Sequence, residues 1–209
     1  MGYFSTRLFA WLQGADFYEN LHRAAVQQLP PGHGKSWLDV GCGPGLLTRL
    51  AAARGYESVG IDLDHHMIRV ARRLAAREAS PATFHAGNVL QPGAPQRQAD
   101  VVSAASLLAV LEDKRAALDQ LIRCVRPGGK LLIVEPTAQL TAKAAKALTH
   151  GRALGRRSSG LRMWAHAREG KAVAPHVFGA LPRDVERIDL LQGLVSAWSV
   201  HVPALATAT

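Results

Sequence analysis

The chain has 209 residues, of which 48% are apolar and 20% are charged. This length and composition predict one folded domain with a hydrophobic core and exclude a disordered or collagen-like protein. No apolar run reaches the ~20 residues that a membrane-spanning helix needs. The two cysteines, Cys42 and Cys124, are too few for a disulfide framework or a zinc site, so we predict no metal. Because no leader sequence is recognisable, we expect a soluble, cytoplasmic protein.

The positive charge is concentrated in one segment. The chain has 25 lysines and arginines against 16 aspartates and glutamates, a net charge of +9. Eight of the basic residues and a single acid, Glu169, fall between Thr141 and Lys171. This basic segment, residues 141–171, fits a solvated helical face, a site for an anionic substrate, or a peripheral contact with an acidic membrane. A nucleic-acid partner is the least favoured interpretation.

Short apolar runs alternate with amphipathic stretches between Trp37 and Pro136. This alternation is typical of strand–helix–strand repeats and predicts a parallel sheet with helices on both faces. The runs that we interpret as buried strands are Ser36–Val40, Glu57–Ile61, Ala82–Ala86, Asp100–Ala105 and Lys130–Glu135.

Two helices are predicted between these strands. Apolar residues at three- and four-residue spacing predict a helix over Asp64–Arg77, with Asp64 as its cap. A similar stripe predicts a helix over Glu112–Val125, which ends before Pro127-Gly128-Gly129.

The pattern changes after the fifth strand. Helices are predicted near Thr141–Arg152 and Ser159–Glu169, and two β-like runs follow at Glu186–Leu191 and Leu194–Val202. Only Gln192-Gly193 separates these runs, which is too short for a parallel crossover, so they must form an antiparallel hairpin. The predicted fold is therefore a doubly wound α/β sheet of seven strands, mostly parallel, with a C-terminal antiparallel hairpin.

The most informative segment is the turn that follows the first strand, Leu38-Asp39-Val40-Gly41-Cys42-Gly43-Pro44-Gly45-Leu46. Three alternating glycines there let the backbone turn sharply and approach a ligand at the carboxyl end of the strand. A dinucleotide site would place its third glycine where this chain has Leu46. We interpret Cys42 as a small apolar residue of the turn and not as a nucleophile.

Two aspartates indicate the charge of the ligand. Asp39 would repel a pyrophosphate but can hold an ammonium group, directly or through water. Asp62 ends the second strand 19 residues after Gly43, the spacing at which an acid accepts hydrogen bonds from ribose hydroxyls. Their positions predict a ligand with a cationic amino-acid end and a nucleoside end.

In these motifs the chain resembles the class I S-adenosylmethionine-dependent methyltransferases, in particular the small-molecule branch typified by the ubiquinone and menaquinone C-methyltransferases. The resemblance covers residues 36–136 and, less specifically, the terminal hairpin. It implies a Rossmann-like fold, S-adenosylmethionine as cofactor and S-adenosylhomocysteine as product. The segments similar to the family's motifs are Leu38–Gly45, Val59–Asp62, His85–Val89, Asp100–Ser103 and Arg126–Pro136.

The resemblance also implies which residues hold the cofactor. Asp62 is expected to bind the ribose and Met67 to lie near the adenine. Asn88 stands where the family usually has an aspartate that binds the adenine amino group, and its carbonyl can still accept that hydrogen bond. The predicted cofactor residues are Tyr18, Asp39, Gly41, Cys42, Gly43, Gly45, Asp62, Leu63, Met67, Gly87, Asn88, Val89 and Ser103.

Methyl transfer by in-line substitution mainly requires that the acceptor be oriented and water excluded. An acceptor that loses a proton also needs a base, and the candidates are Tyr18, Glu135, His166 and His176. The residues expected to contact the acceptor are Trp11, Arg156, Arg157 and Trp164. They predict a small acceptor that is apolar or aromatic and carries an anionic group.

The expected domain, residues 1–209, has four parts: an N-terminal helical lid (1–35), the cofactor-binding core (36–136), a variable substrate cap (137–182) and the terminal hairpin (183–209). Residues 103–107 lack the Asn/Asp-Pro-Pro-Tyr/Phe turn of methyltransferases that act on DNA or protein nitrogens, which favours a small molecule. Two alternatives stay open: a phospholipid or other membrane-associated acceptor, and a non-catalytic cofactor-binding protein.

Overall fold

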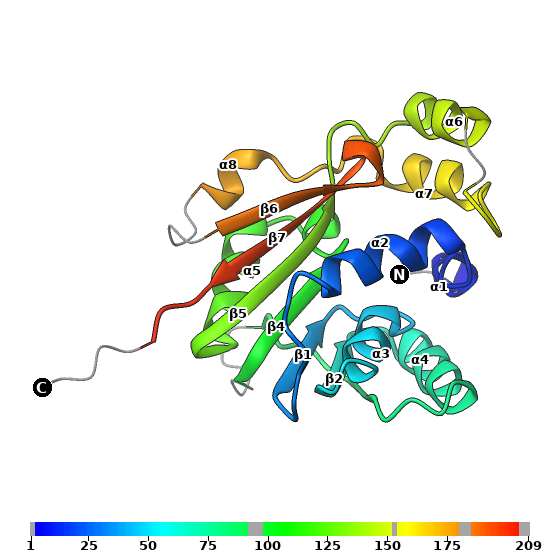
Figure 1. Cartoon of the computed structure of the whole chain (residues 1–209). Helices are drawn as coiled ribbons and strands as arrows, with labels where there is room; N and C mark the ends of the chain where they lie inside the picture. Colours follow the sequence, from blue (N-terminus) through cyan, green and yellow to red (C-terminus); the bar gives the residue numbers. More distant parts are fainter. Residues whose placement is uncertain (1–2, 92–97, 152–153, 180–184, 205–209) are drawn as a thin grey trace, which may run out of the picture.

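The computed structural model describes residues 3–91, 98–151, 154–179 and 185–204 (Figure 1). Predictions that reach the other residues, such as Arg152 of the basic segment and the ends of the lid and hairpin, lie outside the described residues. The strands are β1 (Ser36–Val40), β2 (Glu57–Asp62), β3 (Thr83–Ala86), β4 (Ala99–Ala105), β5 (Val125–Pro136), β6 (Val185–Leu190) and β7 (Val195–His201).

These strands form one sheet in the order β3-β2-β1-β4-β5-β7-β6. Neighbours from β3 to β5 pair in parallel, and β7 pairs antiparallel with both β5 and β6. The predicted α/β fold, a mostly parallel sheet of seven strands closed by an antiparallel hairpin, is therefore confirmed. The strand order reverses between β1 and β4, and ligands of doubly wound sheets bind at the carboxyl ends of strands at such a point.

Helices cover both faces of the sheet (Figure 1). Side chains alternate along each strand, so Trp37 and Leu132 pack on the face of α2 and α3, whereas Leu38 and Leu131 pack on the face of α5. The helices are α1 (Tyr3–Leu12), α2 (Asp16–Val26), α3 (Leu46–Ala52), α4 (His65–Arg77), α5 (Lys114–Arg123), α6 (Ala142–Gly151), α7 (Gly160–Arg168) and α8 (Pro175–Phe178).

The local signals explain where the central helices begin. The Asp64 side chain accepts a hydrogen bond from the backbone N–H of His66, which confirms the predicted cap of α4. Helix α5 begins at Lys114 and not at Glu112, because Asp113 accepts from the N–H of Ala116 and caps the helix there.

Two other boundaries differ from prediction. Helix α5 ends at Arg123 and not at Val125, and Pro127-Gly128-Gly129, the predicted stop, belongs to β5, which begins at Val125 with a register shift against β4. The connection within the terminal hairpin includes Leu191, and all three residues Leu191–Gly193 have positive φ.

Among the described residues, no helix has the length and apolar character needed to cross a bilayer.

Candidate functional site

A cavity of about 600 Å³ lies at the carboxyl ends of β1, β2 and β4. The turn between β1 and α3 and the residues just after β2, β3 and β4 line it, together with residues of α1, α2 and α7. This volume is in the range of small-molecule sites. The cavity also occupies the point where the strand order reverses, as expected of a ligand site in such a sheet.

The glycine turn forms the part of the wall nearest to β1. Gly43 has a φ of +52° and lines the cavity, and a Cβ placed on it would meet nothing within 4 Å. Gly45 has a φ of +81° and faces the other way, where a Cβ would collide with the ring of Phe84. Of the predicted glycine-turn residues, Gly41, Cys42 and Gly43 thus line the cavity. Gly45 does not line it and instead packs against Phe84.

Asp39 lines the cavity but is almost completely buried. Its two carboxylate oxygens accept hydrogen bonds from Ser103 Oγ and Thr48 Oγ1, both at 2.7 Å. Burial raises the pKa of Asp39 to about 6, although the two hydroxyl donors oppose this rise. Ser103 is fully buried between Asp39 and the indole of Trp37 and does not line the cavity. The prediction that Ser103 contacts the cofactor is corrected, because it acts through Asp39.

Asp62 connects the end of β2 to the glycine turn. One carboxylate oxygen accepts a hydrogen bond from the N–H of Gly43 and the other from the N–H of Asp64, both at 2.8 Å. Burial raises its pKa, and these two backbone donors act against that rise. Because each oxygen has a second lone pair, the carboxylate can still accept hydrogen bonds from vicinal hydroxyls in the cavity.

The cavity wall beyond Asp62 has an apolar character. Met67 is buried and Leu63 is 66% exposed, and both line the cavity. Gly87, Asn88 and Val89 line it too, although Asn88 Oδ1 already accepts a hydrogen bond from the N–H of Leu90 at 3.0 Å. A flat heterocycle fits between such side chains, and it would cover the exposed Leu63.

Helices α1, α2 and α7 and the residue after α1 contribute another part of the cavity wall. Phe9, Gln13, Tyr18, His22 and Arg168 line the cavity there. Burial raises the pKa of Tyr18 to about 12, so the phenol keeps its proton. This wall therefore combines aromatic surface with hydrogen-bonding groups.

His22 is buried on α2 and its ring packs against that of Tyr18, with ring centroids 4.4 Å apart and the ring planes tilted by 48°. Its Nδ1 lies 2.7 Å from the carbonyl oxygen of Tyr18, and burial lowers the pKa of the ring to about 4. A neutral ring that donates from Nδ1 to this carbonyl keeps the lone pair on Nε2. Nε2 is then the ring atom that can accept a proton or hydrogen bond from a ligand.

Arg49 links the N-terminal helices to the glycine turn. It is buried, and its guanidinium donates to the Pro44 carbonyl at 2.7 Å, to Gln13 Oε1 at 3.1 Å and to the Glu78 carboxylate at 2.8 Å. The position of Gln13 in the cavity wall is thus coupled through Arg49 to the glycine turn.

Of the four candidate bases, Tyr18 lines the cavity and the other three do not. Glu135 is buried at the end of β5, where its carboxylate accepts from the N–H groups of Leu108 and Ala109 at 2.7 and 3.3 Å. His166 and His176 are exposed on α7 and α8. The prediction of a base at these two histidines is therefore corrected, and Glu135 positions the loop after β4.

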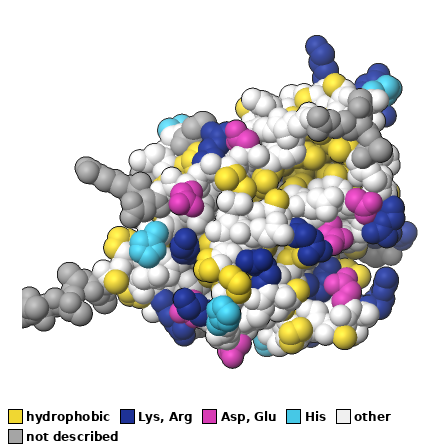
Figure 2. All heavy atoms as spheres, viewed as in Figure 1, with side chains coloured by type: hydrophobic (Ala, Val, Ile, Leu, Met, Phe, Trp, Pro, Cys, Tyr) yellow, Lys and Arg dark blue, Asp and Glu magenta, His cyan; other side chains and the backbone are white. Residues whose placement is uncertain are grey.

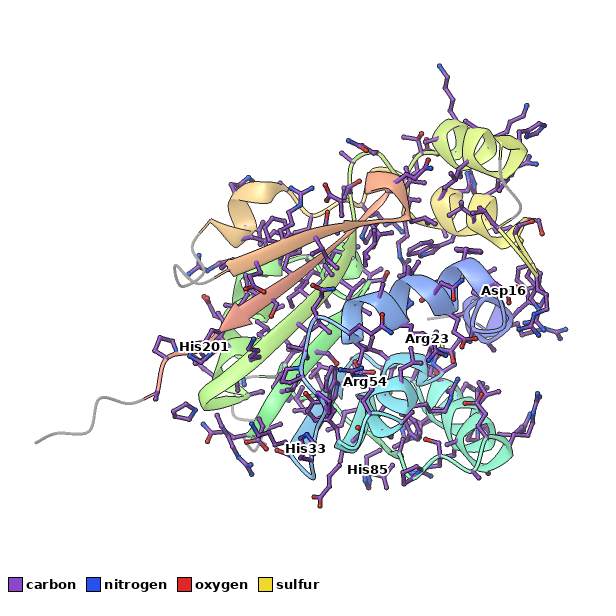
Figure 3. All side chains as sticks on the ribbon, in the orientation of Figure 1. Asp16, Arg23, His33, Arg54, His85 and His201 are labelled. Atoms are coloured by element: carbon purple, nitrogen blue, oxygen red, sulfur yellow. The ribbon has the colours of Figure 1, made fainter. Side chains whose placement is uncertain are left out.

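The predicted acceptor contacts also need correction, since Trp11, Arg156, Arg157 and Trp164 do not line the cavity. Asp16, labelled in Figure 3 at the start of α2, accepts hydrogen bonds from the backbone N–H and the Nε of Arg156 at 2.8 and 3.0 Å. Arg157 packs on the Trp11 ring and donates to the Trp11 carbonyl.

The remaining member of this set, Trp164, is buried against Phe17 and Tyr18. The two lysines of α6, Lys143 and Lys146, are exposed, and Figure 2 shows lysine and arginine side chains scattered over this face of the molecule. Within the described residues, Arg156 and Arg157 of the basic segment thus attach the start of α7 to the N-terminal helices, whereas Lys143, Lys146 and Arg162 are exposed.

Sequence reasoning missed Gln13, His22 and Arg168 as cavity residues. A signal for two of them was present in the helical spacing. Arg168 continues the buried stripe of Leu161, Trp164 and Ala165 on α7, and His22 lies four residues after Tyr18 on α2. A charged or titratable residue on an inward stripe is a candidate wall residue of a cavity.

The sequence model of a methyltransferase-domain family matches residues 12–178. The ubiquinone biosynthesis O-methyltransferase of Idiomarina loihiensis is 36% identical over 100 residues, which are 47% of this chain and 41% of that protein. The nocamycin O-methyltransferase of Saccharothrix syringae is 32% identical over 127 residues, 59% of this chain and 45% of that protein. The chain thus spans less than half the length of these curated relatives.

Among solved structures, the N-methyltransferase NodS of Bradyrhizobium japonicum, determined in complex with S-adenosyl-L-homocysteine, has a TM-score of 0.63 at 20% identity. The alignment covers 92% of this chain and 90% of NodS, and it shows a shared fold. Because the family match covers more than half of the chain and agrees with the motifs, the protein belongs to the class I S-adenosylmethionine-dependent methyltransferases, in the methyltransferase-domain family.

Proposed function

We propose that this protein transfers a methyl group from S-adenosylmethionine to a small-molecule acceptor with an apolar or aromatic body. One observation carries the proposal: Asp39 and Asp62 line the same cavity on either side of the open backbone at Gly43. A buried acid near β1 suits an ammonium group, and an acid at the end of β2 suits ribose hydroxyls.

The residues of the cavity fit the donor along its length. S-adenosylmethionine supplies, when bound, a methyl group already activated on a cationic sulfur. Asp62 would accept from its ribose, and Met67 and Leu63 would flank its base. Asp39, held by Ser103 and Thr48, would favour its ammonium group. Gly43 offers space for close approach of the ligand to the backbone.

The remaining wall would hold the acceptor. Phe9 and Tyr18 supply aromatic surface, and Val110 and Leu111 supply apolar surface from the loop after β4. His22 would accept a hydrogen bond or proton from an acceptor hydroxyl through Nε2, because Nδ1 lies against the Tyr18 carbonyl. Enclosure by α1 and α2 would exclude water and orient the acceptor, which can contribute several kcal/mol to methyl transfer.

The two relatives described above are named as a ubiquinone biosynthesis O-methyltransferase and a nocamycin O-methyltransferase, which supports a small acceptor for this chain. Calorimetric titration of S-adenosylhomocysteine tests the donor part, and we expect saturable one-to-one binding. Transfer of labelled methyl groups to a panel of phenols and aromatic carboxylates tests the acceptor part. A folded protein that binds no S-adenosylhomocysteine would contradict the proposal.

A further inference from the structure

Arg168, the last residue of α7, is a buried cation in the cavity wall. It is 7% exposed and lines the cavity. Removing a guanidinium from water is strongly disfavoured unless an anion or a full set of hydrogen bonds compensates. Within the described ranges, Arg168 forms no ion pair, and its Nε is buried with no hydrogen-bond partner. The guanidinium thus has donors to which this part of the protein supplies no acceptor.

The groups around Arg168 do not satisfy these donors. The Phe9 ring centroid lies 4.9 Å from the guanidinium carbon, a cation–π contact that accepts no conventional hydrogen bond from the N–H groups. Glu135 is the acid whose charge acts on Arg168, but its two oxygens accept from the backbone of Leu108 and Ala109. Arg168 is therefore oriented by its neighbours while its donors stay available.

The charges of the cavity are divided between two walls. Asp39 belongs to β1 and Asp62 ends β2, whereas Arg168 is the last residue of α7, and all three line the cavity. Tyr18 also lines the cavity, and the charges of both Asp39 and Arg168 act on the pKa of its phenol. A positively charged donor is favoured beside the acids, and a negatively charged group is favoured beside the arginine.

We propose that Arg168 binds a carboxylate of the methyl acceptor, an assignment that rests on the proposed function. The methionine end of the donor also carries a carboxylate, so the two sources must be separated. We assign Arg168 to the acceptor because its electrostatic partner Glu135 lies on β5, two strands from the β1 turn that would hold the donor. A guanidinium can hold a carboxylate through two parallel hydrogen bonds, which also fixes the orientation of the acceptor.

The test uses benzoate and its neutral analogue benzamide, titrated calorimetrically into the full chain saturated with S-adenosylhomocysteine. We expect benzoate to bind about tenfold more tightly than benzamide, and Arg168→Gln to abolish this preference. Arg168→Lys keeps the positive charge and is expected to retain part of the preference for benzoate. Arg156→Gln, in the same basic segment but outside the cavity, is the matched control and is expected to retain all of it.

The proposal is overturned if benzoate does not bind, if it binds no better than benzamide, or if Arg168→Gln keeps the preference. It is also overturned if Arg168→Gln weakens binding of S-adenosylhomocysteine about tenfold but leaves that of 5′-methylthioadenosine, which lacks the carboxylate, unchanged. Failure of the proposed function would give a different result. The parent protein would then bind no S-adenosylhomocysteine, while a benzoate titration carried out without S-adenosylhomocysteine would still show whether Arg168 binds a carboxylate.

Discussion

The carboxylate of Asp62 accepts a hydrogen bond from the backbone N–H of Gly43 at 2.8 Å, so the end of β2 and the turn after β1 are fixed to each other. The two residues are 19 positions apart in the chain and line one cavity. A single side chain thus shapes the turn and presents an acceptor to a ligand.

Asp62→Ala is therefore expected to weaken S-adenosylhomocysteine binding at least about tenfold, because charge-assisted hydrogen bonds are lost and the turn is released. Calorimetry measures the effect. Asp119→Ala removes an exposed acid that pairs with Arg115 on α5 and serves as the control. Equal affinities of the Asp62 variant and the parent would refute the donor site.

Donor binding is expected to release protons near pH 6. The pKa of Asp39 is about 6 in the free protein, so part of the population is protonated there. A bound ammonium group favours the carboxylate and lowers this pKa, so affinity should rise from pH 5 to 7 and level off above. Calorimetry in two buffers of different ionisation enthalpy counts the protons. Asp39→Asn should abolish the release, and proton uptake at pH 6 would contradict the prediction.

His22 should make the fold sensitive to acid. Burial lowers its pKa from 6.5 to about 4, so between these values the unfolded chain binds a proton that the folded chain does not. The free energy of unfolding should therefore fall by up to about 3 kcal/mol as the pH decreases from 6.5 to 4. His22→Phe, which keeps an aromatic ring against Tyr18, should lack this contribution in urea titrations. If the free energies of unfolding of parent and variant change in parallel with pH, the predicted contribution of His22 is wrong.

Glu135 should change the free energy of unfolding with pH in the direction opposite to His22. Burial raises its pKa from 4.5 to about 7, so the folded chain binds the extra proton between these values. Its contribution to the free energy of unfolding is complete below pH 4.5 and decreases by up to about 3 kcal/mol as the pH rises to 7. Glu135→Gln should remove this decrease, as thermal unfolding across that range would measure. The idea fails if the variant and the parent lose stability equally over the interval.

Gly45→Ala is expected to destabilise the protein by about 2–4 kcal/mol, because the new Cβ meets the Phe84 ring at a residue with positive φ. Gly34→Ala is the matched control: its φ is +80°, close to the +81° of Gly45, but a Cβ there meets nothing within 4 Å. The control should lose only about 1 kcal/mol. Urea unfolding compares the two, and equal losses would mean that contact with Phe84 has no cost.

The sequence predicted the sheet, and it predicted most of the residues that line the cavity around the β1 turn, because both depend on local patterns. Strand β1, the turn that follows it and Asp62 are contiguous or regularly spaced, and the cap of α4 is a local signal. The acceptor side was predicted poorly, since it depends on which face of α7 packs against α2. Charge alone singled out Arg156 and Arg157, whereas burial places Arg168 in the cavity.

The hydrogen bonds of Arg49 to Gln13 and to the Pro44 carbonyl have a consequence for re-engineering the protein. Chimaeras that import the first two helices of another methyltransferase to change its acceptor would replace Gln13 and leave a buried guanidinium N–H without its acceptor. Such exchanges should weaken donor binding as well as altering acceptor choice. A graft that retains a glutamine at position 13 should separate the two properties.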